Sequence, residues 1–464
     1  MRVILGALLV TLAACAPAER RSPNVVVVLI DTLRPDHLQL GGYPEQTSPF
    51  LDGVAARSTV FLDAVSASSW TAPSTASIFT SVYPQQHGVV EGWFAARALA
   101  RKVRREGHAT LPLNRIREDL ATLPELLREA GYRTFGISTN VNVGPEMGFD
   151  QGFESFYRFP LVRPAQDLRL HQIGTLDVQS EPAEQVYRKL VEWEGRIRGK
   201  EGAPPYFLYL HFNDPHRPYN PRAPWFRDSD DPDRRALSAY DSEIHYLDGW
   251  LEKIWDRLGL QRDTIVVWVS DHGEGFGDHG EYAHRWGLYR ELNHALFVIY
   301  GPGYGILAQR ISERVAAWDL LPTLLDLLGL KAPPERVGWS LAPLVRRGPG
   351  AETLRRKLEK RRLFAHRERR TVAPGEVWAV FSGPWKLIDD IGRIELYDTR
   401  NDVSEQRDRA DAEPEIVGRL RARLDAFKGA MSRVSARRAG ASGATAVEID
   451  SETLRQLQGL GYAE

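Results

Sequence analysis

The sequence is poor in cysteine and nearly balanced in charge. Cys15 is the one cysteine among 464 residues, so the chain has no internal disulfide and no metal cluster built on cysteine ligands. Basic and acidic residues number 60 and 61, which gives a formal net charge of −1. No overall field therefore attracts nucleic acid, and we expect no nucleic-acid partner.

The apolar run at the start of the chain is short. It covers Val3–Val10 after Arg2, which is too short to span a bilayer and is typical of an export signal. The run ends in Leu12-Ala13-Ala14-Cys15, which resembles the lipobox of bacterial lipoproteins. This resemblance implies that the cysteine is acylated and becomes the mature N-terminus.

We therefore expect residues 1–14 to be a signal peptide and Cys15 to carry a lipid. Residues 15–23 would form a tether that reaches at most ~28 Å. The protein is then exported and held at a bacterial cell-envelope membrane, facing the periplasm or the outside. An ordinary signal peptide cut after Ala16 or Ala18 is the alternative.

A repeated pattern follows, in which an apolar run leads directly into polar residues. Asn24–Ile30 is continuously apolar, as expected of a strand buried on both faces, and Asp31 follows it. Ligands gather at the carboxyl ends of strands in parallel sheets, so these polar residues are site candidates. The pattern recurs at Arg133–Ser138 before Thr139-Asn140, Tyr206–Phe212 before Asn213-Asp214-Pro215-His216, Thr264–Val269 before Ser270-Asp271-His272, and Ala295–Tyr300 before Gly301-Pro302-Gly303.

Helical patterns separate these runs, at Pro49–Arg57, Leu123–Ala130 and Arg234–Leu258. Strands that alternate with helices predict an α/β fold, with a large, mainly parallel sheet sandwiched by helices. We expect this catalytic domain to cover residues 24–330.

The pattern changes near Lys331, where short strands follow one another. Consecutive short strands predict a smaller C-terminal α+β unit over 331–430, with a short antiparallel sheet. Its expected elements are strands at Arg362–His366, Val377–Phe381, Trp385–Asp389 and Ile394–Tyr397, and a helix from Ser404 to about Phe427.

Two further segments have no clear place in this order. The tail, 431–464, contains an Ala/Gly/Ser/Arg-rich part, Arg433–Ala446, that we expect to be mobile, and an apolar end, Leu454–Tyr462, that could dock back. Residues 91–118 are rich in arginine. A solvated surface helix explains them most simply, and a lid or a basic surface facing anionic lipid or substrate is the alternative.

Polar residues at the ends of two buried strands suggest a metal site. Asp31, Asp271 and His272 all lie there, and a buried carboxylate is costly unless it binds a metal or pairs with a cation. With Thr71 they form a ligand set that leaves a position open, as a catalytic divalent metal requires.

The stretch Ser69–Thr75 is the candidate nucleophile segment. It lies between a loop of small residues and a helix-like run, Ser74–Tyr83, and its proline suits a first helical turn. A helix N-terminus favours an anion, so a hydroxyl at Thr71 would face a phosphate or sulfate. An ordinary N-cap is the alternative.

Three histidines are candidates for proton transfer or substrate binding. His216 lies four residues after a strand end and could act as a general acid. The glycine-rich segment 269–284 adds His279 and His284 as polar candidates, for the substrate or for a second metal.

These segments resemble the sulfatase family of the alkaline phosphatase superfamily, in consistent order over about residues 24–430. The resemblance implies a metal-dependent hydrolase of a small anionic ester, with Thr71, His216 and His284 catalytic. It implies metal ligation by Asp31, Thr71, Asp271 and His272, and substrate binding by Asn140, His279 and His284. The matching motifs are Asp31–Leu38, Thr71–Thr75 with Ile78–Pro84 and His87-Gly88-Val89, Asp214–Tyr219, Ser270–Glu274, Asp319–Leu325, and Glu395–Asp398.

The departures from this family concern the nucleophile and the metal. True sulfatases convert a cysteine or serine to formylglycine within a C-x-P-S-R segment, whereas this chain has Thr71 and Thr75. We expect no formylglycine, and a phosphothreonine can be hydrolysed in two steps where a threonyl sulfate lacks the elimination route. Thr32 replaces a carboxylate and His272 an amide, which favours zinc or manganese over calcium, although calcium is possible.

The sequence therefore predicts cleavage of a phosphate, phosphonate or sulfate ester through Thr71, with phosphoesters favoured. Two alternatives remain. A phosphoethanolamine-type transferase would use the same threonine but usually carries transmembrane helices. A non-catalytic surface lipoprotein could have kept the fold.

Overall fold

The computed structural model describes residues 22–93, 96, 99–159, 182–284, 287–369, 375–438 and 444–459. The predicted signal peptide and Cys15 lie outside the described residues. Among the helices of this part, none combines the length and apolar character needed to cross a bilayer.

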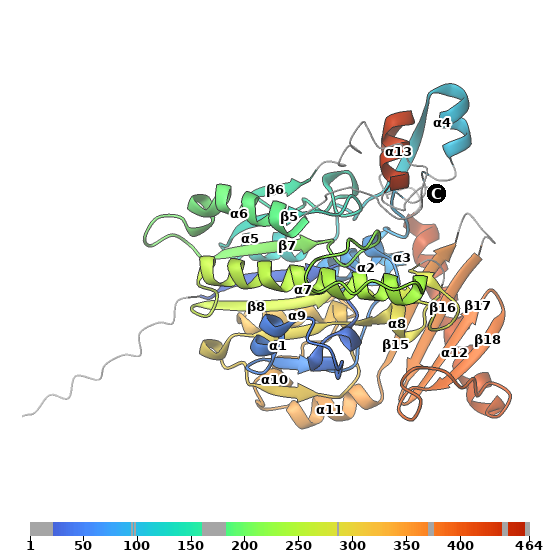
Figure 1. The fold of residues 1–464 in the computed structure, drawn as a ribbon. Helices are drawn as coiled ribbons and strands as arrows, with labels where there is room; N and C mark the ends of the chain where they lie inside the picture. The colour runs from blue at the N-terminus through green and yellow to red at the C-terminus, as the bar shows by residue number, and fades with distance from the viewer. Residues whose placement is uncertain are drawn as a thin grey trace, which may run out of the picture.

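The centre of the molecule is an eight-stranded, mainly parallel sheet (Figure 1). Its parallel part is β8-β1-β7-β5-β6, and β12 runs antiparallel between β8 and β2. The predicted α/β class is thus confirmed. In sheet order the strands are β13 (Gln309–Ile311), β2 (Thr59–Phe61), β12 (Phe297–Tyr300), β8 (Thr264–Ser270), β1 (Asn24–Ile30), β7 (Tyr206–Phe212), β5 (Arg133–Ser138) and β6 (Ser155–Arg158).

The antiparallel direction of β12 separates its end from the other strand ends. The sequence pattern treats Ala295–Tyr300 like the parallel strands, but β12 pairs antiparallel with β8. The glycines that follow it therefore lie at the opposite edge of the sheet.

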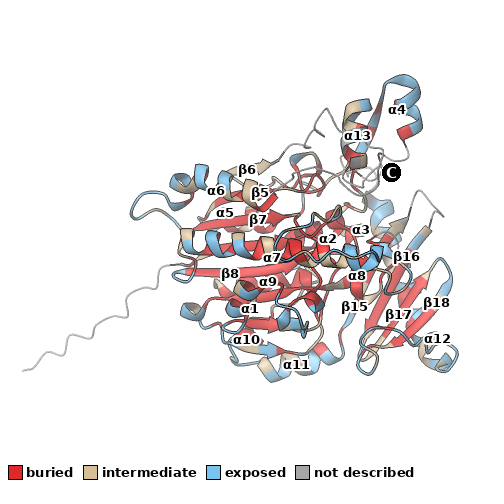
Figure 2. Cartoon of the chain, viewed as in Figure 1, coloured by how far each residue is buried: buried red, intermediate tan, exposed pale blue. Residues whose placement is uncertain are grey.

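Strand β1 is covered on both faces, which explains why polar and apolar residues do not alternate in its sequence. Val25, Val27 and Leu29 belong to one apolar cluster, and Val26, Val28 and Ile30 belong to the cluster on the other face. Both faces of the sheet are covered by helices (Figure 2), so all six apolar positions of the strand are buried and only Asn24 at its start is partly exposed.

The covering helices divide by face. One face packs against α1 (Pro49–Ala55), α6 (Pro182–Arg198) and α7 (Pro232–Leu258). The other packs against α2 (Thr71–Thr80), α5 (Leu123–Glu129), α9 (Leu320–Leu327), α10 (Ala342–Val345) and α11 (Ala351–Glu359).

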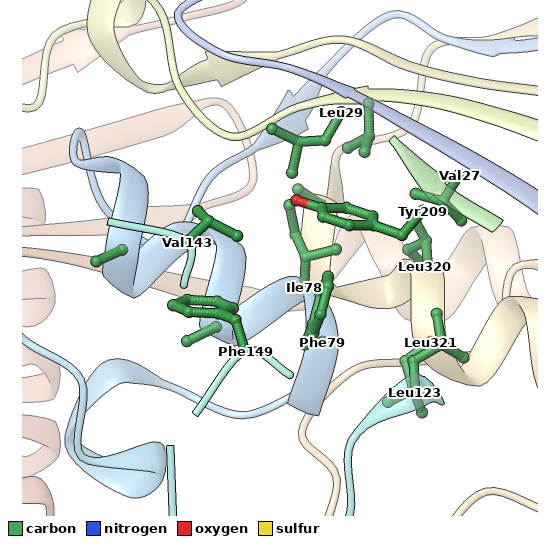
Figure 3. Packing of buried hydrophobic residues seen from close by; sticks show 14 of the residues in the cluster. Val27, Leu29, Ile78, Phe79, Leu123, Val143, Phe149, Tyr209, Leu320 and Leu321 are labelled. Atoms are coloured by element: carbon green, nitrogen blue, oxygen red, sulfur yellow. The ribbon is translucent and has the colours of Figure 1, made fainter. Parts of the chain in front are cut away.

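Helix α2 is buried along its whole length and is fixed by aromatic packing. Ile78 and Phe79 lie against Val27 and Leu29 of β1 and against Tyr209 of β7 (Figure 3). The rings of Phe79 and Tyr209 are 4.8 Å apart between centroids, edge to face. This packing holds the N-terminus of α2 next to the carboxyl ends of β1 and β8.

The C-terminal unit is the predicted antiparallel sheet, with one helix against it (Figure 1). Its helix begins later than expected because residues 399–413 form turns, and Pro414 occupies the first helical position. The elements are β15 (Arg362–Arg369), β16 (Gly375–Ser382), β17 (Trp385–Asp390), β18 (Arg393–Asp398) and α12 (Pro414–Arg438).

The arginine-rich segment and the tail form a joint substructure. Helix α4 (Ala100–Glu106) and strand β4 (His108–Asn114) replace the expected single helix, and β4 pairs antiparallel with β19 (Ala444–Asp450). Helix α13 (Ser451–Gly459) packs beside α4, with Leu454 and Leu457 buried (Figure 1). The tail docks as predicted, but the described parts of 433–446 are helix and strand.

Short elements complete the chain. They are β3 (Ala64–Val65), β9 (Gly275–Phe276), β10 (Tyr282–Ala283), β11 (His294–Ala295), β14 (Val315–Ala316), α3 (Pro84–His87) and α8 (Arg290–Asn293), together with several 3-10 turns.

Candidate functional site

Strand register brings the predicted metal ligands to one level of the sheet. Ile30 at the end of β1 pairs with Phe212 on one side and with Ser270 on the other. Asp31 and Asp271 therefore follow neighbouring strands at the same height. The parallel arrangement predicted this juxtaposition, and the structure has it.

Thr71 is the first residue of α2 and faces these strand ends. Trp70, in an extended conformation, is the N-cap residue. The Thr71 hydroxyl lies 3.5 Å from Asp31 Oδ2 and 3.3 Å from His272 Nε2. The side chain is fully buried. The helix N-terminus adds a partial positive charge where an anionic group would bind Thr71.

Two buried carboxylate oxygens point at the same imidazole. His272 Nε2 is 3.6 Å from Asp31 Oδ1 and 3.6 Å from Asp271 Oδ2. Neither oxygen has a hydrogen-bond partner among the described residues. The opposite ring nitrogen of His272 lies 2.9 Å from Gly273 O, a pure acceptor. Nδ1 therefore carries the proton, and the Nε2 lone pair faces the carboxylates.

This arrangement fits a divalent cation. Ligand atoms of Asp31, Asp271 and His272 all lie within 4.8 Å of one another, and the three residues are buried. Two buried carboxylates without a counter-ion would repel each other and lose their hydration, whereas a cation between them satisfies both orphaned oxygens. The oxygen and nitrogen donors suit zinc or manganese.

The pKa shifts of Asp31 and Asp271 also indicate that the two carboxylates lack a counter-charge. Burial alone would raise the pKa of Asp31, but the hydrogen bond from His211 and the nearby imidazoles lower that pKa below its ordinary value. Burial raises the pKa of Asp271 well above its ordinary value, and the charge of Asp31 raises it further. Each carboxylate thus needs positive charge nearby to remain ionised with the other.

The backbone next to Asp31 has an unusual conformation that helps to hold Asp271. Thr32 has φ of 55°, which is unusual for a β-branched residue. Its N–H donates to Asp271 Oδ1 at 3.3 Å, and its carbonyl accepts from Tyr240 Oη at 2.8 Å. The chain turns sharply after Asp31, and this turn orients the Asp271 carboxylate.

The predicted acid and the predicted anion-binding histidine lie side by side. The ring of His284 is 4.9 Å from that of His216 and 4.7 Å from that of His272. His216 Nδ1 donates to Arg217 O at 2.5 Å, and His284 Nδ1 lies 2.9 Å from Glu274 Oε1. Burial lowers the pKa of His216 to about 4. An anionic ester beside the ring would raise that pKa and favour the proton-donating form.

Asn140 also lies in this group, directly against a predicted ligand. Its amide nitrogen donates to Asp31 Oδ2 and, at 2.8 Å, to Asn213 Oδ1. Its carbonyl oxygen accepts from Asn142 N at 2.7 Å. These bonds orient Asp31, and they place Asn140 at the strand ends where the sequence analysis expected a substrate-binding residue.

His279 is the one predicted site residue that the structure places elsewhere. Its ring stacks on Tyr289 with centroids 4.0 Å apart, and its nitrogens face Glu291 Oε1 at 2.8 Å and Glu405 O at 2.9 Å. The glycine-rich loop turns it toward the C-terminal unit. In this position it neither joins the strand-end cluster nor completes a second metal site.

His279 makes folding stability depend on pH. Burial opposes its charge, but the hydrogen bond and charge of Glu291 prevail and raise its pKa from 6.5 to about 9. The stabilisation is full below pH 6.5 and is lost as pH rises through 9. We expect the free energy of unfolding to fall over this interval in urea titrations. His279→Gln should flatten that fall, whereas His245→Gln, a partly exposed histidine on α7, should leave it unchanged.

Sequence reasoning missed two polar residues of the site. His211 Nε2 lies 3.3 Å from Asp31 Oδ2, and its Nδ1 lies 2.8 Å from Tyr209 Oη. Glu274 is fully buried, and burial raises its pKa to about 7. A histidine inside an otherwise apolar strand was the available signal for His211, and proximity to Asp271-His272 was the signal for Glu274.

Known proteins resemble this chain in sequence. A sequence model described as "Sulfatase" matches residues 23–330, which is more than half of the chain. An arylsulfatase of Clostridium perfringens is 24% identical over 385 residues, covering 70% of this chain and 78% of the relative. A Delta 4,5-hexuronate-2-O-sulfatase of Bacteroides thetaiotaomicron is 23% identical over 393 residues, covering 72% and 74%.

Solved structures share the same fold. The phosphonate monoester hydrolase of Agrobacterium radiobacter superposes with a TM-score of 0.68 at 19% identity. The match covers 88% of this chain and 96% of that protein. The similarity therefore includes the C-terminal unit as well as the central sheet.

Proposed function

The chain belongs to the sulfatase family, and from this premise we propose that it cleaves phosphate or phosphonate esters through Thr71, in preference to sulfate esters. The family places it among hydrolases of sulfuric or phosphoric ester bonds. The observation that carries the proposal is the position of the Thr71 hydroxyl, at a helix N-terminus and within 3.5 Å of Asp31 Oδ2 and His272 Nε2.

Threonine limits which esters can be turned over. A formylglycine hydrate has a second hydroxyl that expels sulfate by elimination, and the Thr71 side chain has none. A phosphothreonine, by contrast, can be released by attack of water on phosphorus. A phosphonate monoester hydrolase and sulfatases share this fold, so the preference rests on the threonine itself.

The proposed reaction has two steps, and Thr71 and His216 take part in both. The Thr71 hydroxyl releases its proton to solvent as its oxygen attacks phosphorus in line, and the phosphorus–oxygen bond to the leaving group breaks. His216 donates its proton to the departing oxygen. Water then attacks the phosphothreonine and gives a proton to His216, the bond between phosphorus and the Thr71 oxygen breaks, and that oxygen takes a proton from solvent, so that phosphate or phosphonate leaves with the Thr71 hydroxyl restored.

Asp31, Asp271, His272 and Thr71 would hold a divalent cation. When bound, this cation would supply positive charge that stabilises the Thr71 oxygen as a nucleophile and a non-bridging oxygen of the ester. Asn140 and His211 hold Asp31 in place for it. His284, oriented by Glu274, faces the side where the ester group would lie.

Sulfate-ester hydrolysis is the second candidate function. The relatives in sequence favour it, since they include an arylsulfatase and a hexuronate-2-O-sulfatase. Small sulfated sugars would then be the substrates. The clustering of Asp31, Thr71, Asp271 and His272 favours either enzyme over a non-catalytic lipoprotein.

A substrate panel tests the proposal. We expect an aryl phosphate diester or phosphonate monoester to give a higher kcat/KM than the matched aryl sulfate, with zinc or manganese supplied. His216→Gln should lower the rate about 10²- to 10⁴-fold, and most for poor leaving groups, because these need protonation. A wild-type enzyme that hydrolyses aryl sulfate fastest would show that the family name describes the activity despite the threonine.

We also propose that Cys15 anchors the protein to the membrane by a lipid. The support is the Leu12-Ala13-Ala14-Cys15 segment. Mass spectrometry of the mature N-terminus decides the question, and an unmodified N-terminus on a protein found in the soluble fraction would contradict the anchor.

A further inference from the structure

An anionic ester needs a cationic side chain, and among the described residues the predicted strand-end groups are carboxylates, imidazoles, an amide and a hydroxyl, none with a permanent positive charge. The central residues are the carboxylates Asp31 and Asp271, with imidazoles around them. Arg34 is buried nearby, but its guanidinium is held by Asp36, Asp278 and the carbonyl of Glu274. Thr75, one turn along α2 from Thr71, offers a buried hydroxyl with no hydrogen-bond partner in the described structure.

The C-terminal unit brings an arginine to this place. Leu363, Ala365 and Arg367 alternate along β15, Arg361 directly precedes the strand in the same alternation, and all four are buried, so they share the face that meets the catalytic domain. At one end of this row, Arg361 pairs with Asp319 at 2.6 and 2.8 Å. At the other end, the guanidinium carbon of Arg367 lies 4.6 Å from the ring centroid of Trp70.

Backbone contact fixes this end of β15 against the nucleophile loop. The N–H of His366 donates to Ala67 O at 2.9 Å, four residues before Thr71. Trp70 immediately precedes Thr71 and is 2% exposed. The arginine is therefore held by a rigid contact beside the N-terminus of α2.

The ring of His284 lies between Trp70 and the predicted metal ligand His272. The ring centroid of Trp70 is 5.6 Å from that of His284, which is 4.7 Å from that of His272. The Trp70 ring therefore lies between the guanidinium of Arg367 and the imidazole of His284, beside the predicted metal ligands.

We propose that Arg367 is a substrate-binding residue that holds the non-bridging oxygens of the ester at Thr71, so that the C-terminal unit completes the site. The inference rests on the proposed function for the identity of the anion. A planar guanidinium suits two oxygens of a phosphoryl or sulfuryl group, and stacking on Trp70 keeps its plane oriented.

The test measures anion binding as well as turnover. Arg367→Met keeps an unbranched apolar side chain but removes the guanidinium that lies over Trp70, and with it the charge. We expect the inhibition constant of inorganic phosphate and the KM of the best ester to rise about 10- to 100-fold. Arg367→Lys should fall between this variant and the wild type, because it keeps charge without the fork. Arg393→Gln, an exposed arginine of the same small sheet, should match the wild type.

The controls separate this inference from a structural role and from the proposed function. Metal content and melting temperature close to wild type in Arg367→Lys, with weakened phosphate binding, would support it. Wild-type phosphate inhibition and KM in both Arg367 variants would overturn it. Inhibition by inorganic sulfate is measured in parallel. If the wild-type enzyme prefers sulfate and Arg367→Met loses affinity for both anions, the phosphoester preference fails while the assignment of Arg367 stands.

Discussion

Replacing Thr71 with alanine is expected to lower kcat/KM on the best ester by on the order of 10⁴-fold or more. The reason is that the substitution removes the atom that bonds to phosphorus, while the buried helix that carries it remains packed. Steady-state kinetics measures the loss, and acid quenching of wild-type turnovers should trap a phosphorylated peptide that contains Thr71.

The same helix offers a matched control. Thr80 is also buried in α2, but its hydroxyl donates to Ala76 O at 2.6 Å, far along the helix from the site. Thr80→Ala should therefore retain activity close to wild type. Undiminished turnover by Thr71→Ala would refute the nucleophile assignment. Ser69 and Ser74 would be the next candidates, although their hydroxyls donate to Gly287 O and Ser68 O.

The second large effect concerns the metal. Asp271→Ala removes one of two buried carboxylates that face His272, so we expect metal affinity to fall at least about 100-fold and turnover to fall with it. Metal analysis of purified protein and titration with zinc or manganese measure the change. Asp278→Ala, which instead removes a partner of Arg34, should keep the metal.

The same pair of carboxylates predicts that a substitution at Asp271 affects the melting temperature differently with and without metal. Without metal, Asp271 must either carry a second buried charge beside Asp31 or take up a proton, whereas Asp271→Asn is neutral and keeps the side-chain oxygen, so this substitution should raise the melting temperature of the metal-free protein. Added metal should raise the melting temperature of the wild type but not that of this variant. Equal metal content and equal metal-induced stabilisation in both proteins would contradict the site.

The juxtaposition of Asp31 and Asp271 was predictable because parallel strands obey a simple rule. An apolar run that ends in a carboxylate places that group at the carboxyl edge of the sheet, and Asp31 and Asp271 follow adjacent strands. Thr71 was predictable from the proline-containing helix start. The antiparallel β12 shows the limit of the rule, because the direction of a strand is set by its pairing and is not evident from its own residues.

The rest depends on contacts between distant segments. The direction of the loop that carries His279 follows from packing against Tyr289 and Glu405, which no local spacing reveals. Arg367 reaches Trp70 through the docking of one unit on the other. Likewise, β19 pairs with β4, which lies far away in the sequence. The composition of the tail alone does not reveal this pairing and therefore predicts mobility.

Strand β1 has a consequence for what the enzyme can reach. Its first residue, Asn24, lies at the amino edge of the sheet, and Asp31 at the carboxyl edge, so seven residues separate the two by about 23 Å. A lipid on Cys15, as proposed, would attach at the amino edge. Thr71 and the strand-end carboxylates would then lie on the side of the sheet away from the lipid attachment, with the depth of the sheet between them and the lipid. Esters dissolved in the surrounding compartment would therefore reach Thr71 more readily than headgroups next to the lipid.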